Sequence, residues 1–188
     1  MHKVALGAVV MAFSMLAAPV AYAQMKVTSD DISEGAASKK DMEANVFGCK
    51  GDNISPSLKW TGAPDGTKSF AINLYDPDAP TGSGFWHWVV FNIPVSTTSL
   101  PKDAGDVKKK LMPKGAIQAR NDYGFWGYGG MCPPEDKSTH HYKLTVYAVD
   151  EDKLQFAKDK TVPAPVVGFE LHFHSKAKAE LNWTFSRP

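Results

Sequence analysis

The sequence predicts a mainly β fold, a β-rich α+β domain, and two patterns carry this prediction. Polar and apolar residues alternate in the segments 70–74, 142–148 and 181–185, which are rich in aromatic and β-branched side chains. Such alternation is typical of strands with one face in the core and one face in solvent. A further run, 88–91, is apolar at every position, as expected for a strand covered on both faces.

Glycine and proline cluster between these segments and favour tight turns, at 62–66, 80–84 and 113–115. We predict one helix over 165–178, because Pro165 suits a first helical turn and Val166, Phe169 and Phe173 recur at helical spacing. A shorter helix is expected over 151–156. The chain contains no internal repeat, low-complexity tract or long linker, so residues 24–188 are expected to form a single domain.

The first residues match a cleaved secretory signal peptide, residues 1–23. A basic start at His2 and Lys3 precedes an uncharged apolar run over 4–18, and Ala21-Tyr22-Ala23 fits a small-residue cleavage site. The run is short for a membrane span, and no charged stop-transfer segment follows it. We therefore expect the mature chain to be exported to the periplasm or secreted, with no transmembrane segment.

The charge balance argues against a nucleic-acid partner. Lys3 is the only Lys, Arg, Asp or Glu in residues 1–23, and without it basic and acidic residues are equal in number. A neutral chain lacks the basic surface that neutralises phosphate backbones.

Two rigid loops beside predicted strands contain the residues with useful chemistry. Asp76-Pro77-Asp78-Ala79-Pro80 is followed by Trp86-His87-Trp88 at the start of an apolar run. The second loop, Gly-Tyr-Gly-Gly-Met-Cys-Pro-Pro over 127–134, is followed by His140-His141-Tyr142. Because each loop adjoins a strand, Asp, His and backbone N–H groups could converge at one end of a sheet, and we predict a site there.

Each of these features also has a purely structural interpretation. On spacing alone, His87 could be a core histidine, and Asp76 or Asp78 could cap a turn through backbone N–H groups. Glycine-rich loops are often plain connections, and this one lacks the Gly-Lys-Ser/Thr of nucleotide-hydrolysing loops. His172 and His174 diverge if they lie on a helix, so we expect them to be ordinary, partly buried histidines.

Taken together and in this order, the motifs resemble the phosphatidylethanolamine-binding protein family, also called Raf kinase inhibitor-like proteins, in its compact bacterial branch. The matching pieces are the Asp-Pro-Asp-Ala-Pro box, the aromatic-His pair, the Gly-x-Gly-Gly-x-Cys-Pro-Pro loop and the His-x-Tyr strand start, and the resemblance spans about 47–187. It implies two antiparallel sheets in a Greek-key arrangement with a few short peripheral helices. It also implies a cis Ala79–Pro80 bond.

The resemblance further implies a small anion pocket, formed by Asp76, Asp78, Pro80, His87, Gly130, Cys132, Pro133, His140 and Tyr142. Asp76 would accept the ring N–H of His87 and raise the pKa of that imidazole, which would then donate to phosphate or carboxylate oxygens. Unshielded N–H groups of the glycine-rich loop would cradle the anion. His140 and Tyr142 would share one face of a strand, with His141 on the opposite, exposed face.

Four positions leave alternatives or depart from the family pattern. Cys49 and Cys132 are the only cysteines and could pair in an oxidising compartment, but Cys132 could equally be a small packing residue of the pocket. Met131 stands where the family usually has proline, so the loop would be less rigid. His141 replaces a common arginine, which would remove a permanent cation from the pocket entrance.

The leading functional expectation is a non-catalytic, exported binding protein without metal or cofactor. Its ligand would be a small anion bearing phosphate, such as phosphoethanolamine or a phosphorylated residue, and it could modulate a partner protein. One alternative is a hydrolase in which Asp76, His87 and His140 hold iron or zinc, although no activated nucleophile is evident. Another is an interaction module that inhibits a protease.

Overall fold

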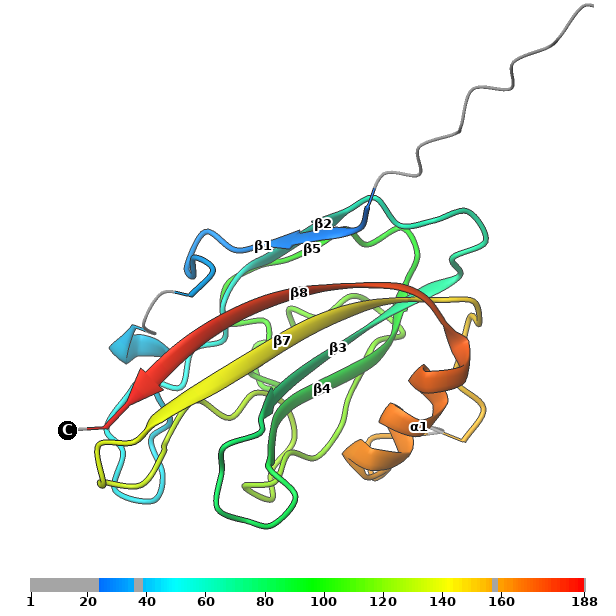
Figure 1. Ribbon diagram of the computed structural model, residues 1–188. Helices are drawn as coiled ribbons and strands as arrows, with labels where there is room; N and C mark the ends of the chain where they lie inside the picture. Colours follow the sequence, from blue (N-terminus) through cyan, green and yellow to red (C-terminus); the bar gives the residue numbers. More distant parts are fainter. Residues whose placement is uncertain (1–23, 36–38, 157–158, 188) are drawn as a thin grey trace, which may run out of the picture.

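The computed structural model describes residues 24–35, 39–156 and 159–187 (Figure 1). The predicted signal peptide, residues 1–23, lies outside the described residues. Two antiparallel sheets account for most of the regular secondary structure, with a helix beside the larger sheet. The β-rich fold class is therefore confirmed.

The larger sheet has five strands in the order β6-β4-β3-β7-β8. They are β3 (Ser69–Asp76), β4 (Phe85–Pro94), β6 (Ile117–Gln118), β7 (Thr139–Val149) and β8 (Ser175–Ser186). Asp76 at the end of β3 pairs with Phe85 at the start of β4, and His140 near the start of β7 pairs with Phe185 near the end of β8. Because every pair is antiparallel, these four strand ends lie on the same side of the sheet, toward the lower left of Figure 1.

The smaller sheet, β1-β2-β5, packs against one face of the larger sheet. Its strands are β1 (Lys26–Thr28), β2 (Leu58–Thr61) and β5 (Ser99–Leu100). Trp60 of β2, Trp88 of β4 and Trp183 of β8 are fully buried in the same apolar cluster. Burial of side chains this large accounts for much of the stability of such a core, at roughly 25 cal/mol per Å² of apolar surface.

A second apolar cluster covers the opposite face of the larger sheet. Ala71 of β3 and Phe91 of β4 pack there with Val167 and Leu171 of α1 (Ala164–His174). The run 88–91 is thus buried on both faces, as predicted. The expectation of one solvent-facing side for 70–74 is wrong, since Ala71 and Asn73 are buried as well.

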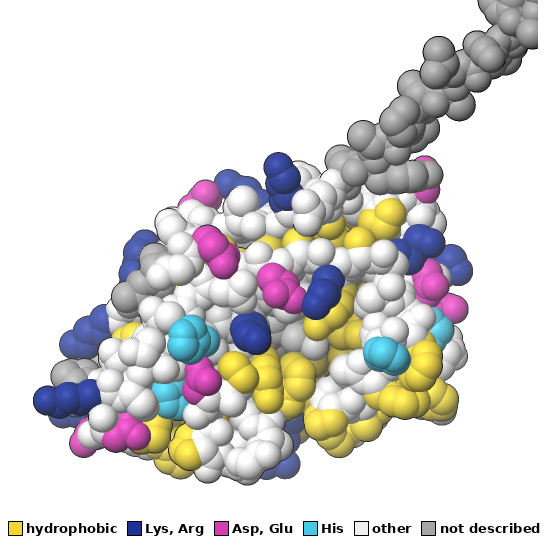
Figure 2. All heavy atoms as spheres, in the orientation of Figure 1, with side chains coloured by type: hydrophobic (Ala, Val, Ile, Leu, Met, Phe, Trp, Pro, Cys, Tyr) yellow, Lys and Arg dark blue, Asp and Glu magenta, His cyan; other side chains and the backbone are white. Residues whose placement is uncertain are grey.

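The predicted helix is present, but it is shorter than expected and buries a different face. It ends at His174, and residues 175–178 already belong to β8, where pairing with β7 continues the sheet. The buried face carries Val167 and Leu171, whereas Phe169 and Phe173 are 57% and 63% exposed. Figure 2 shows hydrophobic side chains gathered on the surface at the corner of the molecule where Figure 1 places α1.

The helix expected over 151–156 is absent. In the described parts of the chain, the other helical segment is a single 3-10 turn, η1 (Lys40–Met42). No helix within those parts is long and apolar enough to cross a membrane.

The orientation of α1 can be tested by truncating one side chain on each face. Leu171→Ala should lower the free energy of unfolding by about 2–5 kcal/mol, because it leaves a cavity under the helix. Phe173→Ala should cost less than about 1 kcal/mol, because the ring is mostly in solvent. Urea unfolding followed by tryptophan fluorescence measures both, and equal costs would contradict the burial described here.

Candidate functional site

A pocket of about 240 Å³ lies at the end of the larger sheet where β3, β4, β7 and β8 meet. The predicted site residues that line it are Asp76, Pro80, His87, Cys132, Pro133, His140 and Tyr142. A larger hollow of about 580 Å³ lies elsewhere, between loops 45–54, 103–109 and 125–128. That hollow contains none of the predicted site residues, so the smaller pocket is the candidate site.

The pocket has a buried floor and a more exposed rim. We call Asp76, His87, His140 and Tyr142 the floor, because each is at most 3% exposed. Among the partly or fully exposed lining residues, we call Phe47, Pro80, Cys132, Pro134 and Arg187 the rim. As predicted, the side chains of His140 and Tyr142 lie on one face of β7 and that of His141, 61% exposed, on the other.

Asp76 pairs with His140 and not, as expected, with His87. The Nδ1–H of His140 donates to Oδ2 of Asp76 at 2.7 Å, and both side chains are almost fully buried. Both β4, which carries His87, and β7, which carries His140, lie beside β3. The Nδ1 atom of His87 is held by the carbonyls of Gly129 and Gly130, so the carboxylate that ends β3 pairs with His140. The other carboxylate oxygen, Oδ1, accepts the backbone N–H of Asp78 at 2.9 Å and closes the turn.

His87 is neutral, which corrects the expectation of a protonated imidazole. Its Nδ1 lies 2.9 Å from the carbonyl oxygen of Gly129 and 3.0 Å from that of Gly130. Carbonyls only accept, so Nδ1 carries the hydrogen and Nε2 is left as an acceptor. Burial lowers the pKa of His87 to about 4, outweighing these bonds and the charge of Asp76. The Nε2 atom is buried and has no hydrogen-bond partner.

The glycine-rich loop turns its N–H groups inward and does not form the expected anion cradle. The N–H groups of Gly127, Tyr128, Gly129 and Gly130 donate to Ala119 O, Gly105 O, His87 O and Asn53 Oδ1, respectively. Gly130 lies behind the pocket, where a side chain would not fit: an added Cβ would come 2.2 Å from Met42 O. The loop therefore contributes carbonyl acceptors that orient His87, while Met131 is fully buried.

Asp78 also lies outside the pocket. Its carboxylate accepts from the backbone N–H and from Nδ1 of His141, both at 2.8 Å. The hydrogen bond with the His141 side chain lowers the pKa of Asp78. The Ala79–Pro80 bond is trans, because no cis peptide occurs in the described residues, which corrects that expectation as well.

Cys49 and Cys132 form a disulfide, with their Cα atoms 5.9 Å apart. Cys132 also lines the pocket, so both interpretations of this residue hold at once. The bond ties the loop that contains Phe47 to the loop that contains Pro133, and both loops contribute to the pocket wall.

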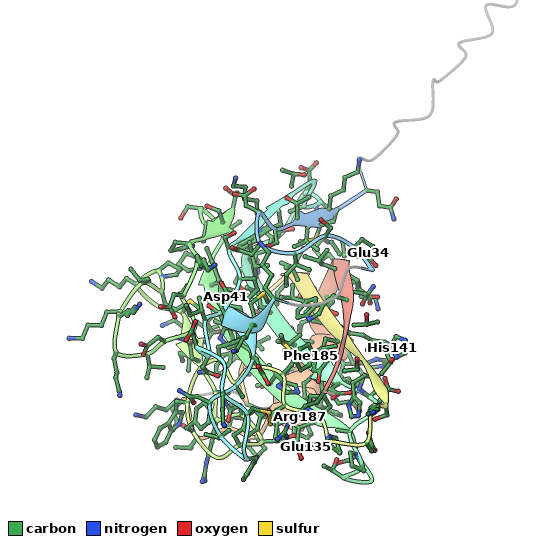
Figure 3. All side chains as sticks on the ribbon, turned by 90° about the vertical axis from the view of Figure 1, so that its left-hand side faces the viewer. Glu34, Asp41, Glu135, His141, Phe185 and Arg187 are labelled. Carbon is green, nitrogen blue, oxygen red and sulfur yellow. A yellow bond between two sulfur atoms is a disulfide. The ribbon has the colours of Figure 1, made fainter. Side chains whose placement is uncertain are left out.

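Sequence reasoning missed Phe47, Phe85, Tyr123 and Arg187, which also line the pocket. Arg187 follows β8, lies beside Glu135 at the end of the molecule shown in Figure 3, and pairs with it. Its Nη1 donates to Pro133 O at 3.4 Å, and its side chain is only 14% exposed. Arg187 thus provides a permanent cation at the rim. The sequence had suggested that this cation was missing, because His141 replaces an arginine that is common in the family. Only Phe85 gave a signal in the sequence, because it shares a strand face with His87.

The tyrosines of the pocket remain protonated at neutral pH. Burial and the nearby charge of Asp76 raise the pKa of both Tyr123 and Tyr142 far above the usual value. Tyr123 donates its hydroxyl hydrogen to Gly130 O at 2.8 Å. The pocket therefore combines a cationic rim with a floor that contains a carboxylate, a neutral imidazole acceptor and a protonated phenol.

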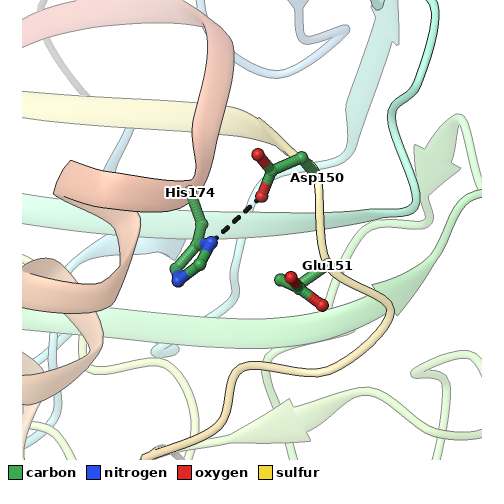
Figure 4. A group of neighbouring side chains, drawn as sticks. All are labelled: Asp150, Glu151 and His174. Atoms are coloured by element: carbon green, nitrogen blue, oxygen red, sulfur yellow. Dashed lines mark hydrogen bonds and ion pairs between the residues drawn. The ribbon is translucent and has the colours of Figure 1, made fainter.

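The metal set of the hydrolase alternative, Asp76, His87 and His140, does not gather its ligand atoms in one place. Among the described residues, the set with ligand atoms within 4.8 Å of one another is Asp150, Glu151 and His174, away from the pocket (Figure 4). There Nδ1 of His174 lies 3.1 Å from Oδ1 of Asp150. As expected, His172 and His174 do not act as a pair, since they lie two residues apart on α1.

Comparison with known proteins agrees with this architecture. The profile of the family described as phosphatidylethanolamine-binding protein matches residues 29–186. In Escherichia coli K12, the UPF0098 protein YbcL is 46% identical over 159 residues, 85% of this chain and 86% of YbcL. The UPF0098 protein YbhB of the same strain is 45% identical over 162 residues, 86% of this chain and 100% of YbhB.

A solved structure shows the same fold. The crystal structure of E. coli YbcL, described as a new member of the mammalian PEBP family, gives a TM-score of 0.85 at 44% identity. The match covers 88% of this chain and 100% of that one. The chain belongs to the phosphatidylethanolamine-binding protein family, as its motifs predicted.

The neutral state of His87 can be tested through the acid stability of the protein. Its pKa is about 4 when folded and about 6.5 when unfolded, so the unfolded chain binds more protons between these values. Stability should therefore fall as pH decreases from 6.5 to 4, with His87 contributing up to about 3 kcal/mol of the loss.

His87→Asn should lack this contribution, because the amide can still donate to Gly129 O but does not titrate. Urea unfolding at pH 7 and pH 4 measures how much the free energy of unfolding changes with pH. The carboxylates contribute equally to this change in wild type and variant, so comparing the two isolates His87. His172→Asn, which replaces an exposed histidine of α1, is the matched control and should behave as wild type. An unchanged pH dependence in His87→Asn would refute a neutral, buried His87.

Proposed function

We propose that this chain is an exported, non-catalytic binding protein for a small ligand that carries a phosphate group. The observation that carries the proposal is the pocket itself, in which Arg187 at the rim and the Asp76-oriented His140 in the floor face one space. A guanidinium is well suited to phosphate oxygens. In the imidazolium form of His140, Nε2–H is a second donor, since the Nδ1 hydrogen already goes to Asp76.

The size of the pocket favours a headgroup or a phosphorylated side chain. A volume of about 240 Å³ is below the roughly 300–1,000 Å³ of sites that enclose drug-sized ligands. Phosphoethanolamine or a phosphorylated residue on a partner protein would place its phosphate inside and the rest of its chain outside. Phe47, 74% exposed at the rim, can contact the part that remains outside.

The candidate nucleophiles and bases around the pocket are not activated, which supports a role in binding without catalysis. Cys132 is in a disulfide, and the hydroxyl of Thr81 donates to Gly84 O, so neither is an activated nucleophile. Tyr123 and Tyr142 remain protonated. His87, with a pKa of about 4, is a weak base at neutral pH.

Two features support export. Residues 1–23 have the pattern of a secretory signal peptide. The Cys49–Cys132 disulfide is the kind of bond that persists in oxidising compartments such as the periplasm.

Arg187→Gln tests the binding proposal. Residues 24–188 should bind inorganic phosphate or phosphoethanolamine in calorimetry, and the substitution should weaken binding roughly 10- to 100-fold, because it removes a charge-assisted contact. Arg120→Gln is the matched control, because Arg120 lies outside the pocket and bonds to Gly124 O. It should bind as wild type.

Two results would count against the proposed function. One is the absence of binding at millimolar phosphate or phosphoethanolamine. The other is phosphoesterase or peptidase turnover by protein with stoichiometric zinc or iron, abolished by His140→Ala, which would establish the hydrolase alternative.

A further inference from the structure

We infer that the pocket selects phosphate groups that carry a proton, because its floor presents hydrogen-bond acceptors to the bound anion. This inference rests on the proposed function and specifies which ionic form of the ligand is bound. A phosphate monoester with one proton has a P–OH donor, whereas sulfate and fully ionised phosphate have only acceptors.

The first acceptor is Nε2 of His87. The carbonyls of Gly129 and Gly130 hold the Nδ1 edge of the ring, and neither glycine lines the pocket. His87 does line it, and the ring edge that carries Nε2 is the edge that those carbonyls do not hold. Nε2 is buried without a partner in the described structure, and leaving such an atom unpaired is unfavourable. A ligand O–H would satisfy it.

The second acceptor is the carboxylate of Asp76. It is almost fully buried and accepts one hydrogen bond at each oxygen, from His140 and from Asp78. A carboxylate oxygen can accept a further bond. Its negative charge repels a ligand dianion at short range, in a poorly solvated site where charges interact strongly. A protonated phosphate both lowers this repulsion and supplies the donor.

The charged and titratable groups that face His87 come from several elements: Asp76 of β3, Tyr123 of the loop after β6, His140 and Tyr142 of β7, and Arg187 after β8. Both tyrosines remain protonated, and Arg187 is permanently charged. The second pKa of a phosphate monoester is about 6, so the ligand itself gains a proton within an accessible pH range. The experiment must separate this proton from any proton that the protein itself takes up.

Calorimetry with methyl phosphate and with sulfate, at pH 5.5 and pH 8, separates ligand protonation from protein protonation. Sulfate keeps the same charge at both pH values, so any change in its affinity reports the protein alone. We expect methyl phosphate to bind at least tenfold more tightly than sulfate at pH 5.5. Its affinity should also fall more steeply toward pH 8 than the affinity of sulfate does.

His87→Asn tests the acceptor directly, because it keeps a donor for the loop carbonyls and removes Nε2. The ratio of methyl phosphate to sulfate affinity should fall at least fivefold. His141→Asn, the same substitution on the exposed face of β7, should leave the ratio unchanged. Asp76→Asn is the second variant, since its amide oxygen can still accept from His140, and it should strengthen sulfate binding. Thermal unfolding of each variant confirms that it is folded.

The outcomes distinguish this inference from the proposed function. Equal affinities for methyl phosphate and sulfate at pH 5.5 would overturn the inference and leave an anion-binding pocket. Binding of phosphoethanolamine without binding of methyl phosphate would also overturn it, because the floor would then accept an ammonium group. Failure of all three ligands to bind would overturn the proposed function, and the inference with it.

Discussion

The burial of the Asp76 carboxylate is the constraint on which the pocket depends. A buried charge is tolerated only with compensating hydrogen bonds, and Asp76 obtains them from His140 and from the backbone of Asp78. The first bond joins the end of β3 to the start of β7, and the second shapes the turn toward β4. The same charge helps to keep Tyr142 protonated. One side chain thus determines the local backbone, the orientation of an imidazole and the sign of the potential in the floor.

The glycine-rich loop has a supporting role that its composition alone does not reveal. Its N–H groups are used in holding the loop to β4 and to the loops around Asn53 and Gly105. Its carbonyls, in turn, fix the tautomer of His87. Glycine is required at 130 because the Met42 carbonyl approaches too closely for any side chain. The loop therefore acts on a ligand through His87, and not through its own amides.

The rim brings together parts of the chain that are far apart in the sequence. The disulfide joins Cys49 to Cys132, and Arg187 reaches Pro133 and Glu135 from the end of β8. A permanent cation at the mouth and a carboxylate in the floor give the pocket opposite charges at its two ends. That polarity is why the ionic form of a ligand, and not only its net charge, is expected to decide its affinity.

The sequence by itself determined the fold class, the positions of the long strands and the convergence of most site residues at one sheet end. Strand periodicity and turn residues are local properties, and the family motifs are local as well. The tertiary structure decided which imidazole Asp76 pairs with, because β4 and β7 both lie beside β3 and the carbonyls of Gly129 and Gly130 hold the ring of His87. It also decided which face of α1 is buried and at which residue α1 ends and β8 begins. The position of Arg187 in the pocket likewise depends on the tertiary structure. Burial and partner choice depend on contacts between distant segments, which spacing along one segment cannot specify.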